Sequence, residues 1–315
     1  AVDSSQNTYH SAQGYSWYIT GYDCCGNPNI DIQSSCLVLM KMNTSDAVVY
    51  IYQIGITTTG IYQYPNTPLW RTDGLIVVGA RTTGGNNGFT LRLINDSALT
   101  TSWNYSYTVT ASGWGPFTYN SPVPTRIDSS NNMYVVAATS RTTFGQGVLV
   151  MKLNSSGDYT WMVGVRRTTS ANFNVDGCTV DSSGNVYVTA GGYFFKLNSS
   201  GTLQWSLLFT SNITTRGVNV LSDGTIAVFM TNTSNYSGNM VMTLPADGSK
   251  TGTFTVGGQS VTVANGSLVQ DTGLTVSRAN ATNTAGITSA NFTTRNNFYS
   301  GSTATLTPAI ATTTI

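Results

Sequence analysis

The chain lacks glutamate and carries little charge of either sign. All 13 acidic residues of the 315 are aspartates, 14 residues are lysine or arginine, and charged residues make up 9% of the chain. Glutamate and lysine favour helices, whereas the abundant threonine and tyrosine suit strands, so the composition predicts an all-β protein. A net charge of +1 without a basic run argues against binding nucleic acid or an anionic membrane surface.

Histidine and cysteine are also scarce. His10 is the single histidine, and the four cysteines are Cys24, Cys25, Cys36 and Cys178, without paired CxxC spacing. These residues are too few for a metal site, and we expect neither a metal nor another cofactor. In an oxidising compartment Cys36 could form a disulfide with Cys24 or Cys25. Cys178 is expected to be a small buried apolar residue.

Long apolar runs are absent too. No stretch approaches the roughly 18 to 20 apolar residues of a transmembrane helix. The hydrophobic content of 40% is nevertheless enough for a large packed core. We therefore expect a folded β protein without membrane insertion.

What the chain does contain is a repeated unit. Its first half is a turn headed by aspartate and followed by a strand of alternating residues, as in "DSSGNVYVTAG" from Asp181. Its second half is an apolar run, a basic residue, a Ser/Gly/Asn turn and an aromatic strand, as in "YFFKLNSSGTLQWSLLF" from Tyr193. A unit of this size cannot bury its apolar face alone, so it stacks against its neighbours.

Five copies of the unit share three marked positions. The leading aspartates are Asp3, Asp73, Asp128, Asp181 and Asp223, the aromatic positions are Tyr50, Trp103, Trp161, Trp205 and Phe254, and the basic positions are Lys41, Arg92, Lys152 and Lys196, with Thr243 in the last copy. We expect the aromatic residues at equivalent positions between sheets. The aspartates are expected to form turns by accepting hydrogen bonds from the backbone two residues on, because one carboxylate is too little for calcium.

Four short strands per unit predict the architecture. Successive basic positions are 44 residues apart from Lys152 to Lys196 and 60 apart from Arg92 to Lys152, which suits propeller blades. We predict an all-β fold, a β-propeller of about five four-stranded blades over residues 1–255, with a Greek-key sandwich as the rival. Because "AVDSSQN" begins within a unit, we expect a processed or partial chain, and a ring closed by pairing an early strand with a late one or with chain upstream of Ala1.

Residues 256–315 form a separate segment. They are nearly without charge and rich in Thr, Ala, Asn and Ser, with apolar residues too sparse for a core of their own. The alternating "QSVTV" and "TGLTVS" predict an extended arm that pairs with a neighbouring subunit or another protein, a disordered tail being the alternative. We expect this arm to serve attachment or oligomerisation in a homo-oligomeric or multi-copy protein.

The lengths of the connections distinguish the two faces of the predicted propeller. The first and third turns of each unit stay short, whereas the second connection and the link to the next unit vary, and variable loops on a rigid scaffold usually carry binding residues. Aromatic and arginine side chains commonly bind sugars and their acidic groups. The candidate ligand-binding residues on these loops are Tyr62, Tyr64, Trp114, Phe117, Tyr119, Arg141, Arg166, Arg167 and Arg216, and the same loops contain Tyr22, Arg81, Phe144, Phe173 and Tyr236. Alternatively, the aromatics cap the core and the arginines aid solubility.

The unit "DSSGNVYVTAG…KLNSSGTLQW" resembles the β-propeller repeats of bacterial and phage proteins. The ending "MTLPADGSKTGTFTVGGQSVTVA" with its Thr/Ala/Ser-rich tail resembles virion structural proteins of marine tailed phages. The first copy departs from the pattern with "YDCCGNPN", and the last lacks the basic residue and the Trp. The resemblance implies an extracellular structural protein of the virion surface, tail or tail fibre, which contacts other virion proteins. The aromatic and arginine residues of the variable loops predict that it binds host-surface polysaccharide.

Two other functions stay open. A secreted or surface-anchored bacterial lectin or adhesin would use the same repeat. A glycoside-acting five-bladed propeller enzyme would need two carboxylates at one bond, and Asp176 is the main candidate near an inner strand. His10 alone is too little for a Ser/His/Asp site, and no GxSxG occurs. The sequence therefore predicts a non-enzymatic attachment protein that binds glycan without cleaving it.

Overall fold

The computed structural model describes residues 2–22, 28–45, 47–54, 62–65, 68–82, 88–96, 100–110, 114–117, 125–141, 145–168, 173–209, 212–233, 239–256, 258–280 and 287–289. For part of the strand residues only the backbone is described. In these ranges there are 25 strands, β1 to β25, and no helix. The expectation of an all-β fold is therefore confirmed.

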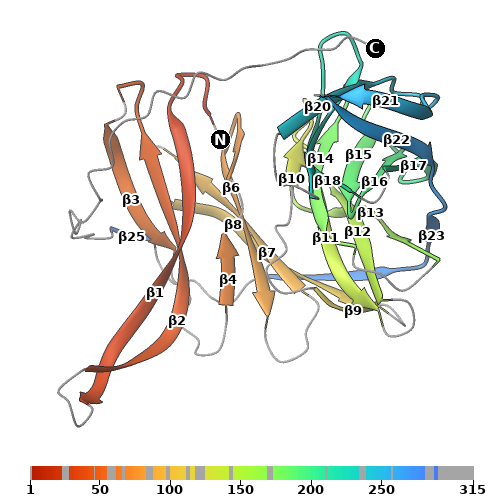
Figure 1. Cartoon of the computed structure of the whole chain (residues 1–315). Helices are drawn as coiled ribbons and strands as arrows, with labels where there is room; N and C mark the ends of the chain where they lie inside the picture. Colours follow the sequence, from red (N-terminus) through yellow and green to blue (C-terminus); the bar gives the residue numbers. More distant parts are fainter. Residues whose placement is uncertain are drawn as a thin grey trace.

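The strands form five antiparallel sheets, one for each repeat unit, and none of the sheets closes on itself (Figure 1). Unit 1 contributes β1 (Thr8–Tyr22), β2 (Pro28–Met42) and β3 (Val48–Ile54). Unit 2 contributes β4 (Tyr62–Pro65), β5 (Leu69–Arg71), β6 (Gly74–Thr82), β7 (Gly88–Asn95) and β8 (Thr100–Thr110). Unit 3 contributes β9 (Trp114–Phe117), β10 (Thr125–Ile127), β11 (Met133–Arg141), β12 (Gly145–Leu153) and β13 (Tyr159–Arg166).

The later strands complete this order. Unit 4 contributes β14 (Val175–Val180), β15 (Val186–Ala190), β16 (Tyr193–Leu197) and β17 (Leu203–Phe209). Unit 5 contributes β18 (Ile213–Val220), β19 (Ile226–Asn232), β20 (Asn239–Leu244) and β21 (Gly252–Val256). The C-terminal segment contributes β22 (Gln259–Asn265), β23 (Val269–Asp271), β24 (Thr275–Asn280) and β25 (Ile287–Ser289).

The leading aspartate builds the first turn of a unit. In unit 4, one oxygen of Asp181 accepts the backbone N–H groups two and four residues on, both at 2.9 Å, and the other accepts the Asn185 amide and the Tyr187 hydroxyl. Asp3 and Asp128 accept the same set of bonds in units 1 and 3. A turn held by four bonds to one side chain is specified locally, which explains why it recurs.

Units 2 and 5 have different first turns. Asp73 forms an ion pair with Arg71, with Nη2 and Oδ2 2.7 Å apart. Asp223 accepts the backbone N–H and the hydroxyl of Thr225. These two turns therefore lack the tyrosine contact of the other three.

In four units the aromatic residue lies opposite the last residue before a bulge. The cross-strand pairs are Tyr50 with Lys41, Trp103 with Leu93, Trp161 with Lys152, and Trp205 with Lys196. In unit 2 the basic position was expected at Arg92, which lies one residue before this place, so that alignment is corrected by one residue. Phe254 has a different place, because β21 pairs with β22 and not with β20.

Buried apolar side chains fill the space between successive sheets. One cluster joins units 2 and 3, a second joins units 3 and 4, and a third joins units 4 and 5. Adjacent residues of one strand serve different clusters, as Val135 and Val136 do on β11 and Phe194 and Phe195 do on β16. Because side chains alternate across a strand, both faces of these sheets are buried against neighbouring units. The first strands follow one another as well, since β5 contacts β10, β10 contacts β14 and β14 contacts β18.

The C-terminal segment pairs with the chain's own sheets. β22 pairs with β17, β23 with β13, β24 with β8 and β25 with β3, so the segment adds a strand beyond units 4, 3, 2 and 1 in reverse order (Figure 1). The expected pairing with a neighbouring subunit or another protein is corrected for these strands, because their hydrogen-bond partners belong to the same chain. Residues 290–315 lie outside the described part, and a role of the arm in attachment stays a prediction.

A glycine turn redirects β21. Val256 at the end of β21 pairs with Gln259 at the start of β22, and Gly258 has φ +77°. A glycine with positive φ favours a tight hairpin, and this hairpin places β21 in sheet 4 beside β22. Sheet 5 therefore has three strands, β18, β19 and β20, where four were expected.

The late and early parts of the chain meet at an outer edge. β25 pairs with β3, whereas β1 forms the opposite edge of sheet 1. An isolated bridge joins Val2 and Thr8 there. Among the described strands, β2 alone pairs with β1, and the predicted closure of a ring stays a prediction.

The contact between Trp161 and the third turn of unit 4 can be tested with two alanine variants. Gly201 and Gly224 have φ of 82° and 83°, which costs about 1–2 kcal/mol for an L-residue. An added Cβ at Gly201 would also lie 2.8 Å from the Trp161 ring, whereas nothing lies within 4 Å at Gly224. In urea unfolding we expect a loss of about 1 kcal/mol for Gly224→Ala and of about 2–4 kcal/mol for Gly201→Ala. Equal losses would contradict this packing.

Candidate functional site

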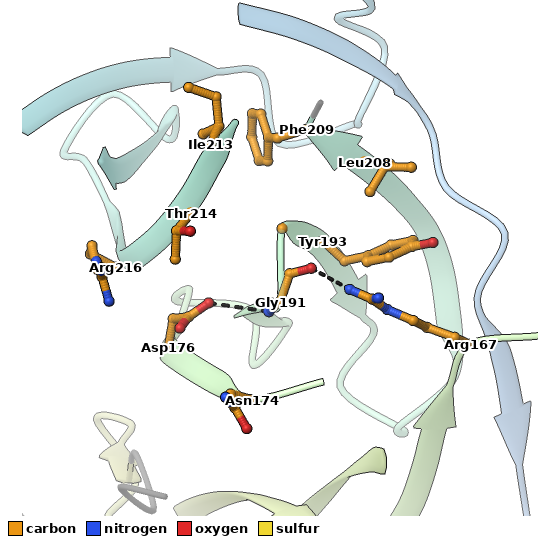
Figure 2. Close-up of a pocket in the computed structure, with 11 residues that line it drawn as sticks. Arg167, Asn174, Asp176, Gly191, Tyr193, Leu208, Phe209, Ile213, Thr214 and Arg216 are labelled. Atoms are coloured by element: carbon orange, nitrogen blue, oxygen red, sulfur yellow. Dashed lines mark hydrogen bonds between the residues drawn. The ribbon is translucent and has the colours of Figure 1, made fainter. Parts of the chain in front are cut away.

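A pocket of about 760 Å³ lies where units 3, 4 and 5 meet. Residues from the link after β13, the β15–β16 turn, the end of β17 and the start of β18 form its wall (Figure 2). The lining residues of chemical interest are Arg167, Asp176, Gly191, Tyr193, Phe209 and Arg216. Arg167 belongs to a link between units and Gly191 to a second connection, which is where variable residues were expected, whereas Asp176, Tyr193, Phe209 and Arg216 lie on the adjoining strands.

A short turn borders the pocket. Gly191 and Gly192 join β15 to β16 with φ of 50° and 81°, and Ala190 pairs with Tyr193. Glycine adopts positive φ at both positions of such a turn without strain. The second connections of the other units are longer and span 23–27, 83–87, 142–144 and 233–238. The pocket thus lies beside the shortest second connection of the five.

Asp176 brings a carboxylate into the pocket from β14. Its Oδ2 accepts the Thr215 hydroxyl at 2.7 Å and the Gly191 N–H at 3.2 Å. Burial raises the pKa of Asp176 from 3.8 to about 6, although both hydrogen bonds and the charge of Arg216 act in the opposite direction. The carboxyl group therefore changes its charge just below neutral pH.

Arg167 forms one side of the pocket. Its guanidinium lies 4.7 Å from the ring centre of Tyr193 and 5.1 Å from that of Phe173, and its Nη2 donates to the Gly191 carbonyl (Figure 2). Both rings are buried, and a cation over aromatic faces is stabilised by the ring quadrupoles. Arg167 therefore fixes the link between units 3 and 4 and acts as a wall of the pocket.

Arg216 is the exposed cation of the pocket lining. Its Nε donates to the Thr231 hydroxyl at 3.0 Å, which holds the guanidinium beside the carboxyl of Asp176. Figure 2 shows Phe209 and Ile213 across the pocket from these polar groups. The site thus combines a carboxylate, a guanidinium and an apolar wall.

The structure separates the nine sequence-predicted ligand residues. Arg167 and Arg216 line the pocket, whereas the Nε of Arg166 forms an ion pair with Asp271 on β23 at 3.0 Å. Trp114 is 5% exposed, and a Cβ built at Gly164 would overlap its ring. Because Gly164 has no side chain, the indole of Trp114 fits into the core. The expectation that Trp114 faces a ligand is therefore corrected.

The remaining candidates are described in part or not at all. Tyr119, Phe144 and Tyr236 lie outside the described residues, and only the backbone is described for Tyr22, Tyr62, Tyr64, Arg81, Phe117 and Arg141. β4 and β9, which carry three of these residues, pair with β6 and β11. Their role in binding stays a prediction.

Of the four cysteines, Cys178 alone has a described side chain. Cys24 and Cys25 lie outside the described residues, and for Cys36 only the backbone is described. The predicted disulfide therefore stays a prediction. Cys178 is a free, buried thiol, and burial raises its pKa to about 12.

Sequence reasoning missed part of the pocket. Tyr193, Phe209 and the Gly191–Gly192 turn were not among the candidates, and Asp176 was considered for catalysis alone. The signal was "AGGY", because a two-residue Gly-Gly turn is shorter than the connections around it. This turn lines the pocket where units 3, 4 and 5 meet.

Metal ligands and membrane spans were searched in the described ranges. No group of three or more His, Cys, Asp or Glu residues there could hold a metal ion. No helix long and apolar enough to cross a membrane is present there either.

Comparisons with known proteins give a distant structural likeness. No family model matches the chain, and no curated protein does. Among solved structures, the chain is similar to a protein of unknown function from Bacteroides caccae, with 13% sequence identity and a TM-score of 0.39. The match covers 69% of this chain and 74% of that protein.

Removal of the buried charge should stabilise the protein at neutral pH. Folding raises the pKa of Asp176 from 3.8 to about 6, so the folded state binds the proton more tightly and loses stability as pH rises from about 4 to about 6. At about 1.4 kcal/mol per pKa unit, Asp176→Asn should raise the free energy of unfolding at pH 7 by up to roughly 3 kcal/mol and flatten this slope.

Chemical unfolding at several pH values measures the effect. Asp223→Asn is the control, because hydrogen bonds with Thr225 lower the pKa of that exposed carboxyl. The slope that it removes has the opposite sign. An Asp176→Asn variant that keeps the pH dependence of the unsubstituted chain would refute the assignment.

Proposed function

We propose that the five units form a β-propeller scaffold. Three observations support this arrangement. Buried clusters lie between successive sheets, the first strands of units 2 to 5 follow one another, and the aspartate turns of units 1, 3 and 4 have the same hydrogen bonds. In such an arrangement the first strands surround the axis, and the C-terminal strands lie at the rim.

We further propose that this scaffold is a non-enzymatic structural protein of a virion surface, tail or fibre that binds host-surface polysaccharide. The pocket beside Gly191–Gly192 carries this proposal. A carboxylate accepts hydrogen bonds from sugar hydroxyls, a guanidinium donates to them, and an apolar wall covers the C–H face of a sugar ring. Asp176, Arg216 and Phe209 supply these three groups in the lining of one pocket, with Phe209 across from the two polar residues.

A binding role fits the carboxylates better than glycoside cleavage does. Glycosidases place two carboxyl groups about 5 to 9.5 Å apart around the scissile bond, and Asp176 is the one acidic residue of the described lining. Its partners, Thr215 and Gly191, donate hydrogen bonds and cannot replace a second carboxylate. We therefore assign Asp176 to recognition of hydroxyl groups.

A matched pair of arginine variants tests the proposal. Arg216→Ala removes the exposed cation of the pocket, whereas Arg126→Ala removes an arginine of β10 that does not line it. We expect Arg216→Ala to weaken binding to purified host-surface polysaccharide about tenfold or more, since hydrogen bonds to charged groups contribute roughly 1.5–3 kcal/mol. Arg126→Ala should bind like the unsubstituted chain.

The outcome separates recognition from general charge. Equal losses for both variants would indicate non-specific electrostatic binding, and no loss for Arg216→Ala would exclude the pocket as the binding site. Particles that carry Arg216→Ala should also adsorb more slowly to host cells. Unchanged adsorption would contradict the attachment role.

A further inference from the structure

The outer edge of sheet 5 differs from the other four. Sheets 1 to 4 each receive a strand from the C-terminal segment, which pairs with the last strand of that unit, namely β3, β8, β13 or β17. Sheet 5 ends at β20, which among the described strands pairs with β19 alone. The strand expected next to it, β21, pairs with β22 instead. Among the described strands, one edge of β20 therefore has no partner.

The sequence of this edge does not protect it from pairing. Sheet edges usually carry lysine, proline or a bulge that prevents association with other chains. β20 reads "NMVMTL" and contains no charge, proline or glycine. Its register with β19 is continuous from Asn239 to Leu244, so the edge is also regular.

The exposed face beside the edge is apolar at its centre. Val241 is 51% exposed and lies directly opposite Phe229 on β19, which is 44% exposed. The opposite face of β20 is buried through Met240, Met242 and Leu244. An added strand must therefore match an apolar centre on one face and continue the core on the other.

We propose that the partner at this edge is β20 of a second copy of the chain, paired antiparallel about a two-fold axis at Val241. In this register Val241 meets its own counterpart, Asn239 meets Thr243, and Met240 meets Met242. Residues directly opposite in a sheet lie on the same face, so polar residues meet polar residues and methionines meet methionines. Such self-complementarity is what a two-fold interface requires, and the absence of charge avoids repulsion between the copies.

The resulting sheet has six strands, three from each copy. The exposed apolar residues then form one row across the axis, with Phe229 at each end and the two Val241 side chains in the middle. The two copies also carry two pockets, which raises avidity for a repetitive ligand. The pairing itself depends on neither the ligand nor the particle.

A lysine at the centre of the edge tests the pairing. Val241→Lys places two like charges opposite each other at the axis, which destabilises a cross-strand pair. Val49→Lys is the matched control, because Val49 is 54% exposed but lies on β3 of sheet 1 and not on β20. By analytical ultracentrifugation of the full chain we expect a dimer that Val241→Lys weakens about tenfold or more and Val49→Lys leaves unchanged.

A cysteine at the same position gives a second measurement. Directly opposite Cβ atoms lie about 4.5–5.5 Å apart, so Val241→Cys should form a covalent dimer under mild oxidation. Val49→Cys should form no more covalent dimer than the unsubstituted chain does. A monomeric unsubstituted chain at about 50 µM would overturn the proposal. So would a dimer that is insensitive to Val241→Lys and that the Val241→Cys variant does not cross-link, because another surface would then join the copies or the chain's own tail would cover the edge.

Discussion

Each repeat unit holds the third turn of the unit that follows it, and this contact fixes how the sheets stack. The bonds across successive junctions are Lys41 Nζ to Asp96 Oδ2 (2.6 Å), Tyr107 Oη to the Gly157 carbonyl (2.7 Å), Trp161 Nε1 to the Ser199 carbonyl (2.9 Å), and Lys196 Nζ to the Ala246 carbonyl (3.2 Å). Apolar burial between sheets is strong but not directional. The hydrogen bonds at the junctions are directional, and each can form at only one relative position of two neighbouring units.

The lysine at the basic position of a unit contacts the aspartate turn of the same unit. In units 1, 3 and 4 it lies 5.2 Å from the ring centre of the tyrosine that is bonded to the leading aspartate. Where the tyrosine is missing, the lysine is missing too, with Ile76 opposite Leu93 in unit 2 and Ala227 opposite Thr243 in unit 5. In unit 2, buried Arg71 donates to the Ser155 carbonyl at 2.8 Å instead. The turn and the junction therefore form one physical unit.

This coupling explains which parts of the fold could be predicted from sequence. The aspartate turns depend on neighbouring residues, so one chain reveals them by repetition. The path of the C-terminal segment depends on distant contacts, such as Gln270, which donates to the Gly201 carbonyl and accepts the Leu203 N–H. The sequence of the C-terminal segment does not by itself predict those contacts. The pocket could not be predicted from sequence for a similar reason, because its shape depends on the lengths of connections in three units.

The pocket also shows what the rigid junctions make possible. Asp176 and Thr215 belong to units 4 and 5, and their oxygen atoms are 2.7 Å apart. A buried carboxylate destabilises the folded state unless its partners stay in place, and those partners are fixed by the packing of β14 against β18. The charge of Arg216 lowers the pKa of Asp176 but does not offset the effect of burial, so the pKa remains raised. A charge retained at this cost to stability, in a pocket beside variable connections, is more easily explained by a ligand than by folding.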